Sequence, residues 1–225
     1  MSLFRLATSA TPAIARFAAA RAYSTQVSGR LADLLRAEHD YETKHVEEPP
    51  AVPEGFSIVT KPGSTNVMMT SKFNDEEVQI FFQVAKQDDP SEGMDDEEGG
   101  EQFNNQNVPH APFVANIIRR GGENPGVLAF ELIADDGDIY IDGIYFGKDI
   151  DVMLSRELND EYKRSLIYSG PNFNTLPEDL QRTWFEFLGE RKIDAAMSDF
   201  IPQYIDYKEN KDYIGWLNDI SRFLK

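Results

Sequence analysis

The sequence predicts an α+β fold, in which an antiparallel β-sheet is preceded by one helix and followed by further helices. Between residues 56 and 146, apolar residues recur with the two-residue period of half-buried strands. The loops between these runs are too short for parallel crossovers, so neighbouring strands are expected to be antiparallel. In the last fifty residues the apolar period changes to 3.6, which is typical of helices packed on a core.

The composition excludes several classes of protein. The 225 residues include 39 acids and 22 bases, for a formal net charge of −17. Nucleic-acid and anionic-lipid binders usually present a basic surface, so direct nucleic-acid binding is not expected. The absence of cysteine excludes disulfides, thiolate metal sites and thiol nucleophiles. No run approaches the roughly 18 apolar residues of a membrane span, so none is predicted.

Residues 1–23 differ from the rest of the chain. They contain three arginines, several Ser, Thr and Ala residues, and no acid. This composition predicts a mitochondrial transit peptide cut after Tyr23, with an ordinary disordered terminus as the alternative. Residues 24–225 then form a single domain. Removing the leader takes away three positive charges and no negative ones, so −17 becomes −20.

A helix is expected at residues 28–42, where Leu31, Leu34 and Leu35 fall at helical spacing. Three leucines form a short stripe, which predicts that this helix packs against a partner surface. The proline-rich stretch 47–55 then forms a linker.

Six strands follow, together with a weaker seventh near residues 166–168. Asp136-Gly137 lies between two alternating runs and predicts a tight hairpin. The six predicted strands are 56–61, 67–72, 78–84, 113–120, 127–133 and 139–146.

The C-terminal helices carry apolar stripes of large residues. Thr175 and Glu178 have the spacing of a capping box at the start of the first helix. A second helix is expected to end or kink at Pro202. One face of the final helix carries Tyr213, Trp216, Leu217, Ile220 and Leu224.

Residues 88–101 form the most acidic stretch of the chain and contain no base. We expect a disordered loop, because a block of like charges repels itself. One interpretation is a solubilising loop without a specific partner. The other is an acidic arm that attracts basic proteins by complementary charge. The eight acids are Asp88, Asp89, Glu92, Asp95, Asp96, Glu97, Glu98 and Glu101.

No catalytic or metal motif is found in the sequence. The three histidines, His39, His45 and His110, match no metal-ligand spacing. Asp136 and Asp138 begin a calcium-loop spacing, but Tyr140 and Ile141 occupy the places of the next acid and the glycine. Neither a cofactor nor a catalytic residue is predicted, and a carboxylate-based hydrolase is a remote alternative.

Two C-terminal segments carry a resemblance to a known family. Residues 168–173, Tyr-Ser-Gly-Pro-Asn-Phe, are followed by Leu176 and by Leu180-Gln181. The closing segment 208–223 adds spaced Lys, Tyr, Trp, Leu, Ile and Phe residues. Together they resemble the mitochondrial acidic matrix protein family, also called the mitochondrial glycoprotein family, which includes the animal complement q-subcomponent globular-head binding protein. Residues 189–193 depart from the family's usual turn, and no Asn-x-Ser/Thr sequon is present.

The resemblance implies a twisted seven-stranded antiparallel sheet flanked by helices, and a doughnut-shaped homotrimer in the mitochondrial matrix. It implies a noncatalytic binding platform or chaperone for basic and newly imported proteins, which supports oxidative phosphorylation and protein homeostasis. An alternative is a regulator of mitochondrial translation or ribosome assembly that acts through basic ribosomal proteins. Leu31, Leu34, Leu35, Tyr213, Trp216, Leu217 and Ile220 are the residues expected to pack the terminal helices, within or between subunits.

Overall fold

The computed structural model describes residues 13–84 and 111–224, with side chains from residue 26 onwards. The chain divides into two compact units. One contains Met1–Val46 and Asn210–Lys225, and the other contains Glu47–Glu209.

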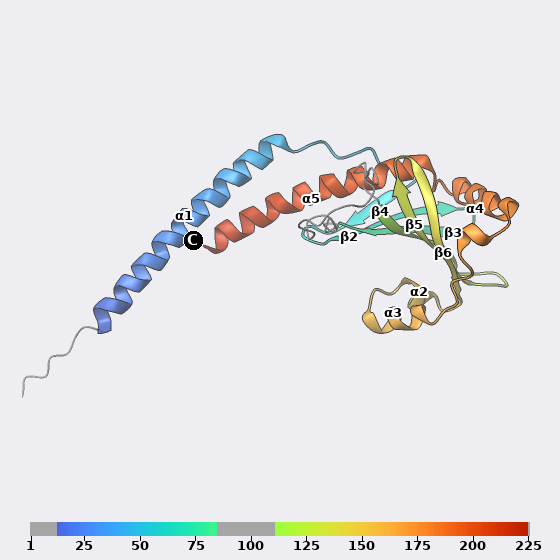
Figure 1. Cartoon of the computed structure of the whole chain (residues 1–225), viewed down its shortest axis with the longest axis horizontal. Helices are drawn as coiled ribbons and strands as arrows, with labels where there is room; N and C mark the ends of the chain where they lie inside the picture. The colour runs from blue at the N-terminus through green and yellow to red at the C-terminus, as the bar shows by residue number, and fades with distance from the viewer. Residues whose placement is uncertain (1–12, 85–110, 225) are drawn as a thin grey trace, which may run out of the picture. The chain divides into compact units, whose positions relative to one another are not determined.

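The larger unit contains a six-stranded antiparallel sheet, in which each strand pairs with its neighbours in sequence (Figure 1). All six strands predicted from the two-residue period are confirmed, with bounds that differ by a few residues. The strands are β1 (Ser57–Thr60), β2 (Asn66–Phe73), β3 (Glu76–Gln83), β4 (Ala111–Arg119), β5 (Gly126–Asp135) and β6 (Asp138–Gly147).

The weak seventh strand expected near residues 166–168 does not form within the described part of the chain. This segment instead ends helix α3 (Leu158–Ser165). The amide of Leu166 donates to the Lys163 carbonyl at 3.3 Å, and that of Ile167 donates to the Arg164 carbonyl at 2.9 Å. Backbone donors that close a helix are not free to extend a sheet.

The hairpin predicted at Asp136-Gly137 is confirmed. The φ angles of these residues are 46° and 84°, as a two-residue type I′ turn requires. Ser198 holds this turn against a helix. Its hydroxyl accepts from the Asp135 amide at 3.2 Å and donates to the Asp138 carbonyl at 2.5 Å.

One face of the sheet is covered by α4 (Glu178–Glu190) and by the first half of α5 (Ala195–Phe223). The core between them is apolar, mainly aliphatic, and contains several aromatic pairs. The Phe130 ring lies 5.5 Å from Trp184, and Phe82 lies 6.0 Å from Tyr204, both edge to face. Such pairs contribute about 1 kcal/mol beyond the burial of their area.

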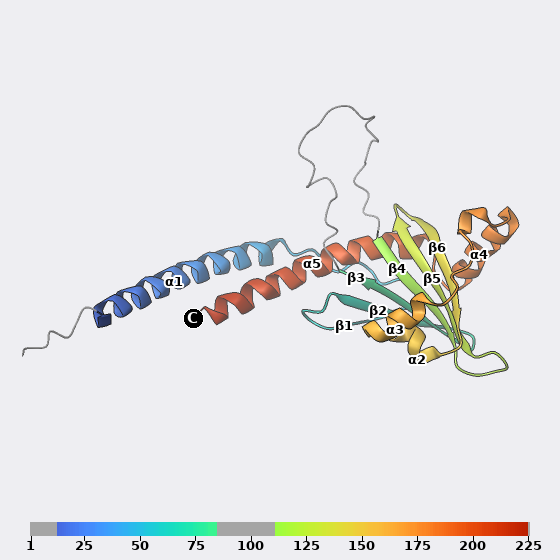
Figure 2. The ribbon, with the colours of Figure 1, turned by 60° about the horizontal axis from the view of Figure 1, so that its bottom comes forward.

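The other face is covered in part by α2 (Ile150–Leu154) and α3, which pack on Ile118, Val127 and Ala129 through Met153 (Figure 2). The sequence analysis did not predict these helices. Gly147 makes their close approach possible, because a Cβ there would overlap the Met153 side chain.

Two expectations for the C-terminal helices are wrong. No capping box forms, because Pro177 precedes α4 and the Thr175 hydroxyl instead donates to the Asn172 carbonyl at 2.7 Å. The two helices separated by Pro202 are one helix, α5, which continues through the proline. Burial of the flanking Ile201 and Tyr204 in the core helps to offset the lost backbone hydrogen bond.

The smaller unit pairs α1 (Ala13–His45) with the end of α5 in an antiparallel arrangement (Figures 1 and 2). The Asn210 amide donates to the Glu42 carboxylate at 3.1 Å. On α1 the buried and half-buried positions follow the alternating spacing of three and four residues that is typical of coiled coils: Ser28, Ala32, Leu35, His39 and Glu42. On α5 the same spacing runs through Asn210, Ile214, Leu217 and Ser221, and half-buried residues flank it at Asp212, Tyr213, Asn218 and Ile220.

Candidate functional site

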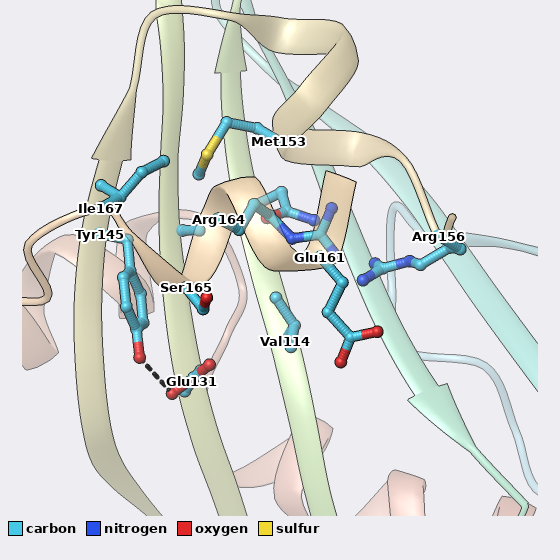
Figure 3. Close-up of a pocket in the computed structure, with 11 residues that line it drawn as sticks. Val114, Glu131, Tyr145, Met153, Arg156, Glu161, Arg164, Ser165 and Ile167 are labelled. Atoms are coloured by element: carbon cyan, nitrogen blue, oxygen red, sulfur yellow. Dashed lines mark hydrogen bonds between the residues drawn. The ribbon is translucent and has the colours of Figure 1, made fainter. Parts of the chain in front are cut away.

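The sheet face beneath α2 and α3 contains a hollow of about 350 Å³ (Figure 3). The sheet forms its floor, and the segment from Met153 to Ile167 forms the opposite wall. The floor residues are Val114, Asn116, Ala129, Glu131 and Tyr145, and the wall residues are Met153, Arg156, Glu161, Arg164, Ser165 and Ile167.

A tyrosine–carboxylate pair occupies one side of the floor. The Tyr145 hydroxyl donates to Glu131 Oε2 at 2.7 Å, from β6 to β5 (Figure 3). The register between these strands shifts after Glu131, so that Asp142 is an extra residue in β6. Gly143 lies opposite Glu131, and a Cβ there would come within 3.0 Å of the Tyr145 ring and 3.3 Å of Glu131. The glycine therefore leaves room for the pair.

This environment keeps the phenol protonated. Burial raises the pKa of Tyr145 to about 12, helped by the hydrogen bond to Glu131 and by the negative charges of Glu131 and Asp142. Ser169 acts in the opposite direction. At neutral pH, Tyr145 is therefore a fixed hydrogen-bond donor to Glu131 rather than an acid or base.

Arg164 fixes the wall of the hollow. Its Nη1 donates to the backbone carbonyls of Val152 and Ser155 at 2.8 and 2.6 Å. The guanidinium therefore ties α3 to the C-terminal end of α2 and satisfies carbonyls that the short helix leaves free. No carboxylate among the described residues lies within ion-pair distance of it, so its positive charge is not neutralised by a direct partner.

Arg156 lies at the rim of the hollow, with its guanidinium 3.6 Å from the centre of the Phe81 ring. It makes no hydrogen bond or ion pair with any residue that the structure describes. Burial lowers the pKa of Arg156, and the nearby charge of Arg164 lowers it further, whereas Glu161 acts in the opposite direction. The hollow therefore holds two neighbouring cations, one of which lacks any polar partner.

Asn116 contributes a polar group to the floor. The residue is 2% exposed, yet its side-chain amide makes no hydrogen bond within the described ranges. No fully enclosed side-chain nitrogen or oxygen in these ranges lacks a partner, so the free amide atoms keep some contact with solvent. Because Asn116 lines the hollow, that contact is on the hollow's side.

The geometry gives no support to catalysis by carboxylates. The shifted pKa values within the hollow belong to a tyrosine and an arginine. In the part of the chain that the structure describes, no group of three His, Asp or Glu side chains could hold a metal ion. No helix among those residues is long and apolar enough to cross a bilayer.

The predicted acidic arm, residues 88–101, lies outside the described residues. Its attachment points are described. The arm lies in the connection between β3 and β4, whose last paired residues, Phe82 and Phe113, face one another. Both ends of the acidic segment are therefore connected to one place in the middle of the sheet.

The residues predicted to pack the terminal helices fall on two faces. Leu217 is buried in the seam between α1 and α5, and Leu35, Tyr213 and Ile220 are half-buried. Leu31, Leu34 and Trp216 are exposed, the last two by 61% and 53%. The stacked rings of Tyr213 and Trp216, 6.0 Å apart, lie at the edge of this exposed apolar surface. Leu35 and Leu217 of the predicted set therefore lie in the seam, whereas Leu31, Leu34 and Trp216 lie outside it.

The hollow was not predicted from the sequence. Its wall comes from two short helices of five and eight residues with no long apolar stripe. Arg156 and Arg164 carry no motif, and Asn116 and Glu131 lie on alternating strands as ordinary polar residues. The pair Gly143–Tyr145 was an available signal, since a glycine two residues from an aromatic residue can mark a close approach.

A family model for the mitochondrial glycoprotein family matches residues 35–224. The chain belongs to this family. The match covers the sheet, the helices on both of its faces and most of the smaller unit's described residues. It confirms the resemblance that the C-terminal segments indicated.

Several proteins are similar in sequence to this chain over most of its length. The mitochondrial acidic protein mam33 of Schizosaccharomyces pombe is 34% identical over 213 residues, which cover 87% of this chain and 78% of the relative. An uncharacterised mitochondrial protein of Arabidopsis thaliana is 26% identical, covering 76% of this chain and 62% of its own length. The conserved regulator of innate immunity protein 3 of Caenorhabditis elegans is 25% identical, covering 76% and 70%. None of these names describes an enzyme, and those of the first two place them in mitochondria.

Solved structures show the same fold. The crystal structure of the Trypanosoma brucei p22 protein superposes with a TM-score of 0.72 at 23% identity, and covers 88% of this chain and 99% of p22. A Leishmania major protein described as a sequence homologue of human p32 has a TM-score of 0.71 at 22% identity, with 87% and 98% covered. This chain therefore shares its fold with p22 and with the p32 homologue.

Proposed function

We propose that this chain is a noncatalytic, homotrimeric acidic protein of the mitochondrial matrix that binds basic proteins as a platform or chaperone. Its clients would be newly imported precursors and other basic matrix proteins. By holding them in solution it would support protein homeostasis and oxidative phosphorylation. The observation that carries the proposal is the acidic segment 88–101, inserted between two central strands of a sheet that is otherwise short-looped.

The position of the insertion favours capture of clients. Eight of the 39 acids lie within fourteen residues, and β3 and β4 connect them to a rigid framework at both ends. A concentrated charge speeds the encounter with an oppositely charged partner and weakens as salt screens it. A loop that only keeps the protein in solution would not need its acidic residues to be concentrated in one segment.

Assembly into a trimer is supported by the exposed apolar surface of the smaller unit. Large apolar side chains line α1 and the end of α5 beside their common seam, and water is a poor environment for so many of them. The exposed residues on the two helices are Val27, Leu31, Leu34, Tyr41, Trp216 and Phe223. Three mature chains together would carry a net charge of about −60, which would strengthen the field around each acidic segment.

The leader 1–23 supplies a defined basic probe, since it carries three arginines and no acid. Binding of this synthetic peptide to the chain lacking residues 1–23 is measured by fluorescence anisotropy at low and physiological salt. We expect affinity to fall several-fold as salt rises. We also expect it to fall several-fold at low salt when Asp95, Asp96, Glu97 and Glu98 are changed to Asn or Gln.

The matched control removes four exposed acids elsewhere, by changing Glu47, Glu48, Glu54 and Glu123 to Gln. Both variants have the same net charge, so the control separates a local site from a general effect of charge. Equal loss of affinity in the two variants would contradict a binding role for the acidic segment. Affinity that does not change with salt would contradict charge-driven capture altogether.

A further inference from the structure

We propose that the hollow beneath α2 and α3 binds a small organic anion, whose carboxylate or phosphate group is held by Arg156 and Arg164 and whose neutral polar group bonds to Asn116. The proposal does not depend on the acidic segment or on basic clients, because it rests on other residues, those that line the hollow. The volume of the hollow, about 350 Å³, is at the lower end of the range usual for small-molecule sites.

The two arginines argue for an anion. Of the two carboxylates that also line the hollow, Glu131 is bonded to Tyr145, and Glu161 bonds neither arginine within the described residues. Arg156 and Arg164 lie close enough for the charge of one to lower the pKa of the other. Neither guanidinium has an ion pair with a described carboxylate, although this chain has a large excess of acids. An anion placed between two guanidiniums would relieve their repulsion and accept charge-assisted hydrogen bonds.

The geometry of the cations favours planar or tetrahedral oxyanions. Arg164 uses only Nη1 for the carbonyls of Val152 and Ser155, so its other nitrogens have no partner in the described structure. The Arg156 guanidinium carbon lies 3.6 Å from the centre of the Phe81 ring, and the nitrogens of this exposed side chain have no partner in the described structure. Two such forks match the oxygens of a carboxylate or phosphate.

The floor argues for a second, neutral polar group on the ligand. Asn116 is 2% exposed and has an unpaired amide that can both donate and accept. Its amide keeps some contact with solvent, and a ligand that removed this contact without offering a hydrogen bond would leave the amide unpaired at a cost, so a hydroxyl or amide at this point would be favoured over an apolar group. Glu131 is already engaged by Tyr145 and closes that side of the floor.

The test titrates the chain lacking residues 1–23 with two probes, inorganic phosphate and L-malate, a dicarboxylate that carries a hydroxyl group. Chloride at matched ionic strength is the reference. The readouts are the Arg156 Nε–H and Asn116 side-chain amide signals in nitrogen–proton NMR spectra, each assigned by its loss on substitution. We expect a saturable shift of both signals with at least one probe, and the comparison of the two probes distinguishes phosphate from carboxylate recognition.

Three variants make the test specific. Arg156→Gln should abolish saturable binding, and Arg156→Lys should weaken it because the planar fork is lost while the charge stays. Asn116→Ala should weaken malate binding several-fold. Arg182→Gln is the control, since Arg182 is 68% exposed in surface ion pairs on α4, and it should bind like the parent chain.

Shifts that grow linearly with both probes, or that persist unchanged in Arg156→Gln, would overturn the proposal. Loss of leader-peptide binding in the acidic-segment variant, with anion binding retained, would support the two sites as separate. If anion binding fails while peptide binding remains, only the small-molecule site is refuted.

Discussion

Arg191 and Glu76 form a buried ion pair that joins the end of α4 to the start of β3 across 115 residues of sequence. Nη2 of Arg191 lies 2.7 Å from Glu76 Oε2, and both side chains are 6% exposed. The guanidinium also rests on the Phe187 ring at 3.5 Å, and its Nη1 donates to the Phe187 carbonyl. Arg119 bonds the other oxygen of Glu76 at 2.6 Å, so both carboxylate oxygens have partners.

Removing one charge of this pair should destabilise the fold. Glu76→Gln leaves the buried Arg191 guanidinium with only the exposed Glu190, 3.7 Å away, as a counter-charge, and we expect a loss of about 3 kcal/mol in the free energy of unfolding. Urea denaturation at a fixed protein concentration measures the loss. The neighbouring Glu77→Gln is the control, because Glu77 meets the exposed Arg120 at 3.4 Å and should cost less than about 1 kcal/mol. Equal losses would contradict the special role of the buried pair.

Tyr145 should ionise at a higher pH than a free tyrosine side chain does. Its pKa is raised to about 12, so the unfolded chain loses this proton at lower pH than the folded chain does. The stability due to Tyr145 is therefore fully present below about pH 10 and is lost as pH rises through 12. Phenolate absorbance should show a late titration that is missing in Tyr145→Phe. In that variant, the decline of stability between pH 10 and 12 should also be shallower. An identical late titration in the variant would refute the assignment.

Gly147 should tolerate alanine only when Met153 is shortened. The added Cβ overlaps Met153, so Gly147→Ala should cost about 1–3 kcal/mol by overpacking and displace α2. In the background of Met153→Ala, the same glycine substitution should cost less than about 1 kcal/mol. A double-mutant cycle from urea melts measures this coupling. Additive losses would show that some other contact forbids a side chain at position 147.

The two faces of the terminal helix pair should separate assembly from folding. Leu34→Asp with Trp216→Asp places charge on the exposed surface, so it should dissociate the proposed trimer while helix content stays unchanged. Leu217→Asp buries a charge in the seam and should reduce helix content as well. Analytical ultracentrifugation and circular dichroism make the comparison. A trimer that survives the double substitution would place its interface elsewhere.

Local periodicity was enough to predict the sheet, because each strand alternates and pairs with the next strand in sequence. Periodicity could not predict the ion pair of Arg191, because no residue near Arg191 in sequence indicates that its partner is Glu76, 115 positions away. The expectation that a helix ends at Pro202 failed for a related reason. The rule that proline ends helices considers only neighbouring residues, whereas Ile201 is buried by contacts that are distant in sequence. The hollow depends on a register shift at Glu131 and on two helices of minimal length, which no periodic pattern encodes.

The pairing of each strand with its neighbours in sequence has a consequence for the nascent chain. Each strand finds its partner immediately behind it, so the sheet can grow stepwise as a ribosome or an import channel delivers the polypeptide. The sheet face that carries Phe82 and Phe130 nevertheless stays exposed to solvent until α4 and α5, the last two helices of the chain, have been synthesised. A protein proposed to bind and hold others thus passes through a stage in which its own apolar sheet face is exposed, and a chain truncated before Glu178 would never leave that stage.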